Sequence, residues 1–278
     1  MMNDATQSPL GRATPYSSHY DPGLLFPIPR ASGRAALGIA GAPPFVGVDI
    51  WNAYELSWLD PRGVPRVALG EFHVPADSPN LLESKSLKLY LNGFGHERLA
   101  GIEPLRSRIA ADLSQAAGAP VTVILHDLRE AAHRTASCEA TAGRSIDDAG
   151  IDIDRYAPPE PGFLGTLPGD EVEETLVSDL LKSNCPVTGQ PDWASLRVEY
   201  QGRRIDPDGL LRYIVSFREH AGFHEDCVER IFVDIMRCCA PRRLAVYARY
   251  TRRGGLDINP WRSSDRRAPA GNIRLPRQ

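Results

Sequence analysis

The sequence predicts an α+β protein made of two consecutive modules, each an antiparallel sheet with helices packed on one face. The chain has 278 residues, which is enough for two domains. Strand-like runs and one helical run follow one another in the same order in two parts of the chain. A stretch rich in proline and acidic residues separates these two parts, as is typical of a linker.

Strand patterns define the first module, which we place at residues 44–133. The runs 49–59 and 66–74 are predicted strands. The run 86–94, Ser-Leu-Lys-Leu-Tyr-Leu-Asn-Gly-Phe, alternates apolar and polar residues and predicts a third, half-buried strand. A closing strand is predicted at 121–125, where every second residue is apolar.

The second module, at residues 175–278, repeats this order of elements. Strands are predicted at 193–201, 211–217 and 244–248. The residues of the two modules differ, so the duplication is inferred from the order of the elements alone.

One helix is predicted in each module from apolar residues spaced three and four apart. In the first module these residues are Ile102, Leu105, Ile109 and Leu113. In the second they are Val228, Ile231, Phe232 and Ile235. Gly118 and Pro120 are expected to end the first helix.

Two segments outside the modules are predicted to be irregular. Residues 1–43 are rich in Pro, Gly, Ser and Ala and form the predicted leader, and residues 134–174 form the linker. Residues 1–14 lack the apolar segment of a secretory signal, and no apolar run approaches the roughly 18 residues of a spanning helix. We therefore expect a cytoplasmic protein that does not bind membranes.

Charge and cysteine content exclude several classes. The formal net charge of −3 argues against a bulk binder of nucleic acid or anionic membranes. The five cysteines are an odd number at uneven spacing, which argues against a disulfide framework and for a reducing compartment. No metal site is predicted, because Cys238 and Cys239 are adjacent and neither CxxC nor HExxH occurs.

Cys185 is the first candidate for chemistry. It lies in the segment 181–193, Leu-Lys-Ser-Asn-Cys-Pro-Val-Thr-Gly-Gln-Pro-Asp-Trp, seven positions before Asp192. Three residues of the segment favour turns: Pro186, Gly189 and Pro191. We expect an exposed, rigid loop that brings the carboxylic acid towards the sulfur, as a thiolate nucleophile with a nearby proton source requires. A loop cysteine without chemistry is the alternative that the spacing leaves open.

The run Glu-Ser-Lys-Ser-Leu-Lys-Leu-Tyr at 83–90 gathers cations and hydroxyls beside one carboxylate. The groups that suit a phosphate are Ser84, Lys85, Ser86 and Lys88. Glu83 would repel a phosphate, so it fits better against a neutral ligand edge that carries N–H donors. A solvated strand face is the alternative interpretation.

Two further segments carry candidate binding residues. Gly-Phe-His-Glu-Asp at 222–226 opens the second helix, where Glu225 can accept hydrogen bonds from adjacent N–H groups of a guanine-like base and His224 can relay protons. Acidic capping of the helix is the alternative. In Arg-Arg-Gly-Gly-Leu-Asp-Ile-Asn-Pro at 252–260, arginines before a Gly-Gly turn can bind a phosphate, or simply form a basic turn. We interpret Cys227, Cys238 and Cys239 as core cysteines.

Together these segments resemble one family, the two-module NADPH-dependent 7-cyano-7-deazaguanine (preQ0) reductases, which are nitrile reductases of queuosine biosynthesis. The family's Glu-Ser-Lys-Ser-x-Lys-x-Tyr motif is intact at 83–90, and the nucleophile segment is present at 183–193. Phe-His-Glu occurs at 223–225, and Arg-Gly-Gly-Leu-Asp-Ile-Asn-Pro at 253–260. The four motifs occur in the family's order.

The resemblance covers roughly residues 40–130 and 175–265. It implies tandem tunnelling-fold modules, in which antiparallel sheets assemble into a barrel with helices outside. It also implies an enzyme that binds a small-molecule substrate and NADPH, has no direct nucleic-acid partner and uses no metal or flavin. We expect a homodimer.

The resemblance assigns three groups of site residues. The catalytic residues are Cys185, Asp192 and His224. The substrate-binding residues are Glu83, Ser84, Lys85, His224 and Glu225. The NADPH-binding residues are Lys85, Ser86, Arg253 and Gly254, with Arg252 as a further candidate for the 2′-phosphate.

The implied reaction reduces the nitrile of 7-cyano-7-deazaguanine to the primary amine of 7-aminomethyl-7-deazaguanine. The Cys185 thiolate adds to the nitrile carbon and gives a covalent thioimide, whose nitrogen Asp192 protonates. Two alternatives remain. One is a pterin- or GTP-processing tunnelling-fold enzyme, although the chain lacks the Cys/His cluster such an enzyme needs. The other is a purine-binding module with an inert thiol.

Overall fold

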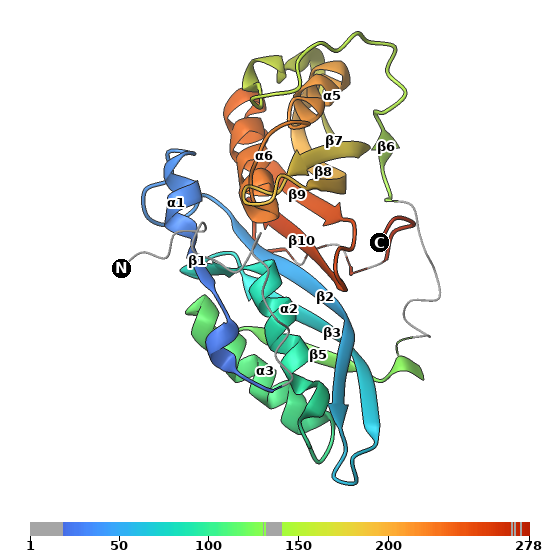
Figure 1. The fold of residues 1–278 in the computed structure, drawn as a ribbon. Helices are drawn as coiled ribbons and strands as arrows, with labels where there is room; N and C mark the ends of the chain where they lie inside the picture. The colour runs from blue at the N-terminus through green and yellow to red at the C-terminus, as the bar shows by residue number, and fades with distance from the viewer. Residues whose placement is uncertain (1–18, 130, 132–140, 268, 270, 273) are drawn as a thin grey trace. The chain divides into compact units, whose positions relative to one another are not determined.

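The computed structural model describes the chain outside residues 1–18, 130, 132–140, 268, 270 and 273 (Figure 1). The described residues fall into two compact units. Unit 1 takes its residues from 1–36, 48–138 and 252–258. Unit 2 takes its residues from 37–47, 139–251 and 259–278. Both units combine a sheet with helices, so the predicted α+β class is confirmed.

Unit 1 contains an antiparallel sheet in the order β5-β3-β2. Its strands are β2 (Val46–Leu59), β3 (Pro65–Pro75) and β5 (Thr122–His126), which confirms three of the predicted strands. The predicted helix is α3 (Ile102–Ala117), and it ends as expected at Gly118, whose φ is 73°. The sheet and helices share one apolar core, which includes Trp51, Phe72, Val123, Leu105 and Ile109.

Residues 86–94 do not form the predicted strand. They belong to α2 (Ser84–Asn92) and the 3₁₀ helix η3 (Gly93–His96). Glu83 caps the helix because its carboxylate accepts hydrogen bonds from two backbone N–H groups of the first turn. The apolar residues of this run also fit a helical spacing, since Leu87, Tyr90, Leu91 and Phe94 are all buried.

Unit 2 contains a mixed sheet in the order β10-β9-β8-β7-β6. The strands β7 (Thr166–Asn184), β8 (Pro191–Ile205), β9 (Arg243–Tyr250) and β10 (Leu256–Ser263) pair antiparallel. The short β6 (Arg144–Ser145) pairs parallel with β7. The predicted strands at 193–201 and 244–248 are therefore confirmed.

The second predicted helix is α6 (His224–Cys239), and its four predicted apolar residues are all buried. Residues 211–217, predicted as a strand, instead form most of α5 (Pro207–Val215). Asp206 caps this helix by accepting from the Asp208 N–H, and proline occupies the first helical position. These two local signals outweigh the alternating pattern that suggested a strand.

The segments predicted to be irregular contain regular elements. The described part of the leader includes η2 (Pro22–Leu24), β1 (Pro27–Pro29) and α1 (Arg30–Ala35). The strand β1 pairs with β4 (Asn80–Leu82).

In the linker, residues 134–140 lie outside the described residues, and η4 (Pro161–Phe163) is followed by β7 from Thr166 onwards. The beginning of β7 has mostly exposed side chains, so its backbone pairing with β8 extends it where no apolar pattern marks a strand.

Residues 252–258 also depart from the predicted boundaries. The sequence grouped them with the second module, but they pack in unit 1. There the Tyr54 N–H of β2 donates to the Gly255 carbonyl over 3.0 Å. The arginines and glycines that connect β9 to β10 therefore belong to the first unit.

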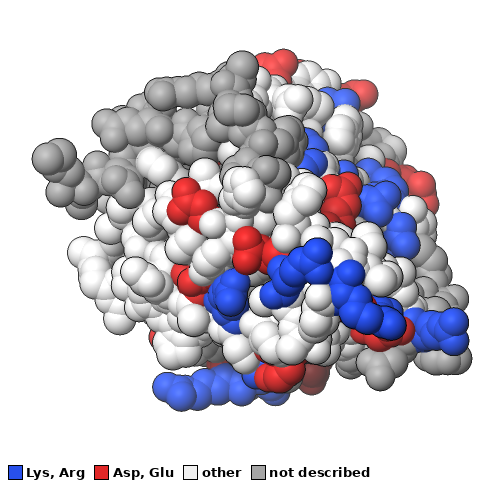
Figure 2. Space-filling view, turned by 60° about the horizontal axis from the view of Figure 1, so that its bottom comes forward, with Lys and Arg blue, Asp and Glu red and all other residues white. Residues whose placement is uncertain are grey.

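Charged residues of both signs lie next to one another on the face drawn in Figure 2. This mixed surface agrees with the formal net charge of −3. Among the described residues, no helix is both long and apolar enough to cross a membrane.

Candidate active site

The hairpin of β7 and β8 positions the candidate nucleophile in unit 2. Ser183 lies opposite Asp192 in the register, and Asn184 lies opposite Pro191. The turn that joins the strands is closed by the Cys185 N–H, which donates to Gln190 O over 2.8 Å. The pairing therefore folds the segment back as predicted and places Asp192 across from a residue two positions before the cysteine.

Backbone hydrogen bonds join the end of this hairpin to the loop that precedes α6. The Asn184 N–H donates to His220 O over 2.8 Å, and the Gly222 N–H donates to Asn184 O over 3.1 Å. The helix α6 begins two residues after this loop, at His224. Two segments that lie far apart in the sequence therefore meet at one end of the hairpin.

Asp192 and His224 form the polar pair of the site. His224 Nε2 lies 3.3 Å from Asp192 Oδ2. The imidazole ring stacks on the ring of Tyr250, with centroids 3.7 Å apart and planes at 4°. The other nitrogen, His224 Nδ1, is buried and has no hydrogen-bond partner among the described residues. The stacking fixes the ring, and Nδ1 retains its capacity to bind a ligand.

The site is buried, which differs from the exposed loop that the sequence suggested. Cys185 is 4% exposed, Asp192 6% and Glu225 2%. The reason is the packing of the hairpin end against the 220–222 loop, which the turn-forming residues alone do not reveal. A buried thiol and carboxylate can react with a bound ligand in a place from which bulk water is excluded.

Cys227 is a second thiol near the site, but it is not suited to be a nucleophile. Burial raises the pKa of the Cys227 thiol to about 12, although hydrogen bonds with Ser183 and Tyr250 partly oppose this shift. Burial also raises the pKa of Cys239 to about 12. The core assignment is therefore confirmed for both. For Cys238 it is wrong, because this residue lies in the last turn of α6 and is exposed.

Two residues of this cluster were not predicted. Tyr250 is the last residue of β9, which is buried from Leu244 onwards. Burial, followed by the charges of Cys227 and Asp192, raises the pKa of its hydroxyl well above the usual value. Ser183 precedes Cys185 by two positions and is fully buried. Both side chains stay neutral, so they can support the site without adding charge to it.

Glu83, predicted to bind substrate, lies in unit 1 at the beginning of α2. Its Oε1 accepts from the Lys85 N–H over 2.7 Å, and its Oε2 accepts from the Ser86 N–H over 2.8 Å. Burial raises the pKa of this carboxyl, and the two backbone hydrogen bonds oppose the shift. The Ser84 hydroxyl lies 3.4 Å from Oε1.

Ser86, predicted to bind the cofactor, is occupied within the fold. Its hydroxyl donates to Glu83 O over 2.7 Å and accepts from the Phe26 N–H over 3.0 Å. The residue is fully buried. Ser86 therefore holds the beginning of α2, and its contact with the cofactor stays a prediction.

The remaining candidates for a phosphate lie together in unit 1. Lys88 Nζ lies 3.9 Å from Glu55 Oε2, and a Cβ placed on Gly254 would come within 3.0 Å of the same Nζ. A small hollow beside these groups is lined by Ala53, Glu55, Leu56, Lys88, Leu91, Asn92, Gly254, Gly255 and Leu256. The lysine and the glycine turn thus combine a cation with backbone that a ligand can approach closely.

Comparison with known proteins identifies the family of this chain. The family model described as "Nitrile reductase, 7-cyano-7-deazaguanine-reductase N-term" matches residues 16–125, and the model "QueF-like protein" matches residues 191–269. A relative from Bordetella pertussis is 60% identical over 273 residues, covering 98% of this chain and 99% of its own. A relative from Stenotrophomonas maltophilia is 57% identical over 281 residues, covering all of both chains. Both are named NADPH-dependent 7-cyano-7-deazaguanine reductase.

The chain belongs to this reductase family. The resemblance and the tandem tunnelling-fold class expected from the motifs are confirmed. The matched ranges contain the motifs at 83–90, 223–225 and 253–260, together with Asp192. Cys185 lies outside both ranges but within the length shared with the full-length relatives.

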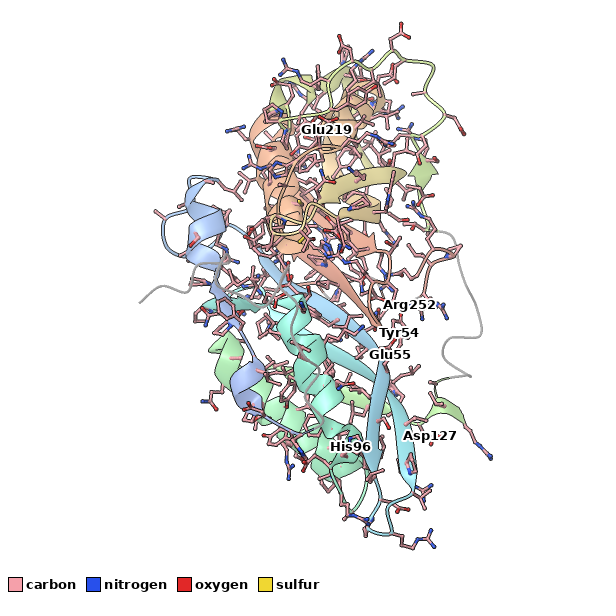
Figure 3. All side chains as sticks on the ribbon, viewed as in Figure 1. Tyr54, Glu55, His96, Asp127, Glu219 and Arg252 are labelled. Carbon is pink, nitrogen blue, oxygen red and sulfur yellow. The ribbon has the colours of Figure 1, made fainter. Side chains whose placement is uncertain are left out.

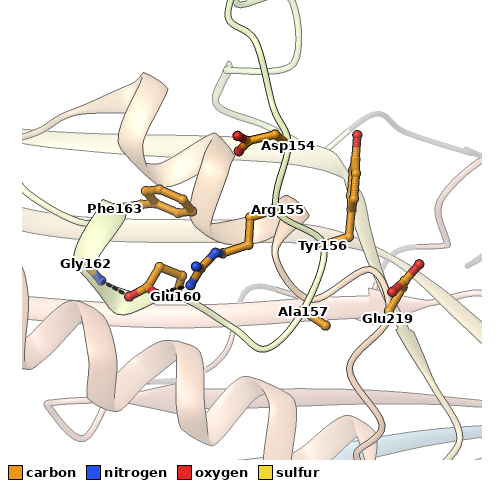
Figure 4. Close-up of a pocket in the computed structure, with 8 residues that line it drawn as sticks. All are labelled: Asp154, Arg155, Tyr156, Ala157, Glu160, Gly162, Phe163 and Glu219. Carbon is orange, nitrogen blue, oxygen red and sulfur yellow. Dashed lines mark hydrogen bonds and ion pairs between the residues drawn. The ribbon is translucent and has the colours of Figure 1, made fainter.

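A hollow of about 740 Å³ opens elsewhere in unit 2 of this reductase-family chain (Figure 4). It is lined by Asp154, Arg155, Tyr156, Ala157, Glu160, Gly162, Phe163 and Glu219. Within it Glu160 forms an ion pair with Arg155 and accepts from the Gly162 N–H over 3.1 Å. None of the candidate site residues contributes to this hollow, so we do not include it in the active site. Across the described chain, no three His, Cys, Asp or Glu side chains gather as metal ligands would.

Proposed function

We propose that this chain reduces the nitrile of 7-cyano-7-deazaguanine to 7-aminomethyl-7-deazaguanine with NADPH, as a step of tRNA queuosine biosynthesis. The observation that carries the proposal is the 3.3 Å pair between His224 of α6 and Asp192 of the hairpin whose turn begins at Cys185. The names of the full-length relatives support the substrate and the cofactor. Cys185 and Asp192 lie at the same end of one hairpin and His224 pairs with Asp192, which supports the addition of a thiol to a nitrile with an acid and a base nearby.

In the proposed mechanism, the Cys185 sulfur attacks the nitrile carbon. A C–S bond forms, and one π pair of the C≡N bond moves to the nitrogen, which takes a proton from Asp192 to give a neutral thioimide. The thiol proton passes to the Asp192–His224 pair, so the site regains the proton that it gave up. A nitrile is a weak electrophile, whereas the C=N group of the thioimide is a better acceptor.

Two reductions complete the reaction. NADPH would supply the two hydrides, one for the thioimide carbon and one for the imine carbon, and two molecules would be needed in turn because each carries one hydride. Between the two reductions, the C–S bond of the intermediate breaks and the sulfur leaves as thiolate. The nitrogen of the resulting iminium gives a proton to the Asp192–His224 pair, which passes it to the thiolate and leaves a neutral imine. Each reduction also places one proton on the nitrogen. We assign the delivery of this proton to the same pair, which takes a replacement from solvent each time.

The donor set in unit 1 fits a phosphorylated cofactor. Lys85 lies in the first turn of α2, and Lys88 lies beside the Gly254–Gly255 turn. Cations and a glycine turn are what phosphate groups bind. We propose that Lys85, Arg253 and Gly254 bind NADPH, with Lys88 as a further contact.

Intact mass spectrometry tests the proposed function. Incubation with 7-cyano-7-deazaguanine in the absence of NADPH should add the mass of one substrate molecule to the protein. A purine-binding module with an inert thiol would bind the compound reversibly and show the unmodified mass. The absence of an adduct under conditions where binding is measurable would contradict the covalent mechanism.

Glu225 is expected to recognise the base, because its buried carboxylate can accept from adjacent N–H groups. Glu225→Gln should weaken substrate binding by about 1.5–3 kcal/mol, the typical cost of losing a hydrogen bond to a charged group. Calorimetric titration of substrate and NADPH measures both affinities, and that for NADPH should stay within error. Equal weakening of both ligands would show that Glu225 acts on the fold and not on the substrate.

Arg253→Ala should raise the KM for NADPH and reduce the preference for NADPH over NADH, because a phosphate loses a cationic partner. Formation of the thioimide needs no cofactor and should keep its rate. Arg62→Ala is a suitable control, since Arg62 is a strongly exposed arginine of the same unit beside Asp60. If Arg253→Ala blocks the adduct and leaves the NADPH dependence unchanged, the arginine belongs to the substrate site.

A further inference from the structure

Tyr54 of β2 contacts the 252–257 segment in three ways (Figure 3). Its N–H donates to Gly255 O over 3.0 Å. The guanidinium carbon of Arg252 lies 5.1 Å from the centre of its ring. Its hydroxyl donates to Asp257 Oδ2 over 2.6 Å. One side chain and its backbone therefore hold the beginning, the middle and the end of this segment.

Asp257, which accepts the hydrogen bond from the Tyr54 hydroxyl, is a buried carboxylate. It is 1% exposed, and its second oxygen, Oδ1, accepts from Asn52 Nδ2 over 2.7 Å. Asn52 and Tyr54 are two residues apart on the same strand, so their side chains project from one face of the sheet. A buried carboxylate with a donor on each oxygen is fixed in position, because losing either donor leaves a desolvated charge.

The segment between these contacts is a tight turn. Gly254 and Gly255 have φ values of 62° and 79°, which only glycine adopts without strain. The Arg253 N–H donates to Leu256 O over 2.8 Å, and the Leu256 N–H donates to Arg253 O over 3.3 Å. Two central residues with positive φ between such a pair are typical of a type I′ turn.

We propose that Tyr54 is a positioning residue for the cofactor. It holds Arg252 and the glycine turn in the orientation in which they bind the phosphates of NADPH. The inference rests on the proposed function, in which Arg253 and Gly254 bind NADPH. A long arginine side chain loses much rotamer freedom when it binds a phosphate. The Tyr54 ring removes part of that freedom in advance, and the hydroxyl–carboxylate bond anchors the turn that carries the arginines. Tyr54 thereby determines the preference for NADPH over NADH without touching the reacting atoms.

Two variants separate the ring from the hydroxyl. Tyr54→Leu removes both, and we expect it to raise the KM for NADPH about three- to tenfold and to lower the NADPH/NADH preference by a similar factor. Tyr54→Phe keeps the ring and should show a smaller rise. Thioimide formation without NADPH should keep its rate in both variants, because Cys185 and its neighbours lie in the other unit.

Tyr20→Phe provides a matched control within unit 1. The Tyr20 hydroxyl donates to Asp112 Oδ2 over 2.8 Å, and the Arg108 guanidinium lies 5.0 Å from its ring centre. The variant loses the same kind of hydrogen bond beside the same kind of stacked arginine, but remote from the glycine turn. It should change the melting temperature about as much as Tyr54→Phe and leave the KM for NADPH unchanged.

A double-mutant cycle decides whether Tyr54 acts through Arg252. If it does, Tyr54→Leu and Arg252→Ala should each raise the KM for NADPH, and the double variant should be no worse than the poorer single variant. Additive effects, or a folded Tyr54→Leu variant with the parent KM, overturn the inference. If Arg252→Ala and Arg253→Ala leave the NADPH affinity unchanged, the cofactor site itself is misassigned. If the arginine variants lose affinity and Tyr54→Leu does not, only the role of Tyr54 fails.

Discussion

Cys185→Ala is expected to abolish nitrile reduction and to leave the substrate bound. The alanine variant cannot form the C–S bond, so the nitrile remains the weak electrophile that it is in solution. The Asp192–His224 pair and Glu225 remain in place, so binding should change little. Steady-state turnover, substrate affinity by calorimetry and the intact mass after incubation with the nitrile test the three parts of this prediction.

Cys238→Ala is the matched control, because this cysteine is exposed on α6 and lies outside the site. It should keep both activity and adduct. Residual turnover above a few per cent in Cys185→Ala, measured with a preparation free of parent enzyme, would rule out covalent catalysis. An adduct that persists in Cys185→Ala would instead point to another thiol as its position.

Several elements could be predicted from the sequence because one pattern dominated each of them. The helix at Ile102–Ala117 has apolar residues at the helical period, and the strand at Arg243–Tyr250 is a short, nearly continuous apolar run, as a strand buried on both faces shows. The helices at Ser84–Asn92 and Pro207–Val215 were mistaken for strands because their apolar residues fit both periods. Asp206 before a proline is a readable helix start, whereas a glutamate in the cap position, as at Glu83, is not a usual signal.

The residues of the candidate site fall into two groups: those that a sequence motif identifies, and those that only the folded structure brings together. Cys185, Asp192 and His224 could be named because each lies in a short segment with its own chemistry. Tyr250 and Tyr54 could not, because their roles arise from strands that meet residues far away in the chain. The placement of residues 252–258 in unit 1 could not be predicted either, since the composition of the segment does not indicate which sheet it joins.

Asp192→Asn is expected to keep the fold and to lower turnover by about 10²–10⁴, the usual contribution of a general acid. Asparagine has nearly the same size and can still contact His224, but it can neither give nor take a proton at pH 7. Because the thioimide nitrogen must be protonated as it forms, adduct formation should slow together with turnover. The KM for NADPH should remain that of the parent. Stopped-flow absorbance or quenched mass measurements of the adduct, with and without NADPH, follow these quantities separately.

Asp179→Asn serves as the control for this change, since Asp179 is a mostly exposed aspartate of β7 that pairs with Ser195. It should retain the parent rate of adduct formation. If Asp192→Asn also reacts at the parent rate, Asp192 only orients the imidazole, and His224 supplies the proton. Those two roles can be told apart, because His224→Asn would then lose the activity that Asp192→Asn keeps. If both variants are slow and the double variant is no slower than either, the two residues act as one proton-transfer unit, as the 3.3 Å separation between Asp192 of the Cys185 hairpin and His224 of α6 leads us to expect.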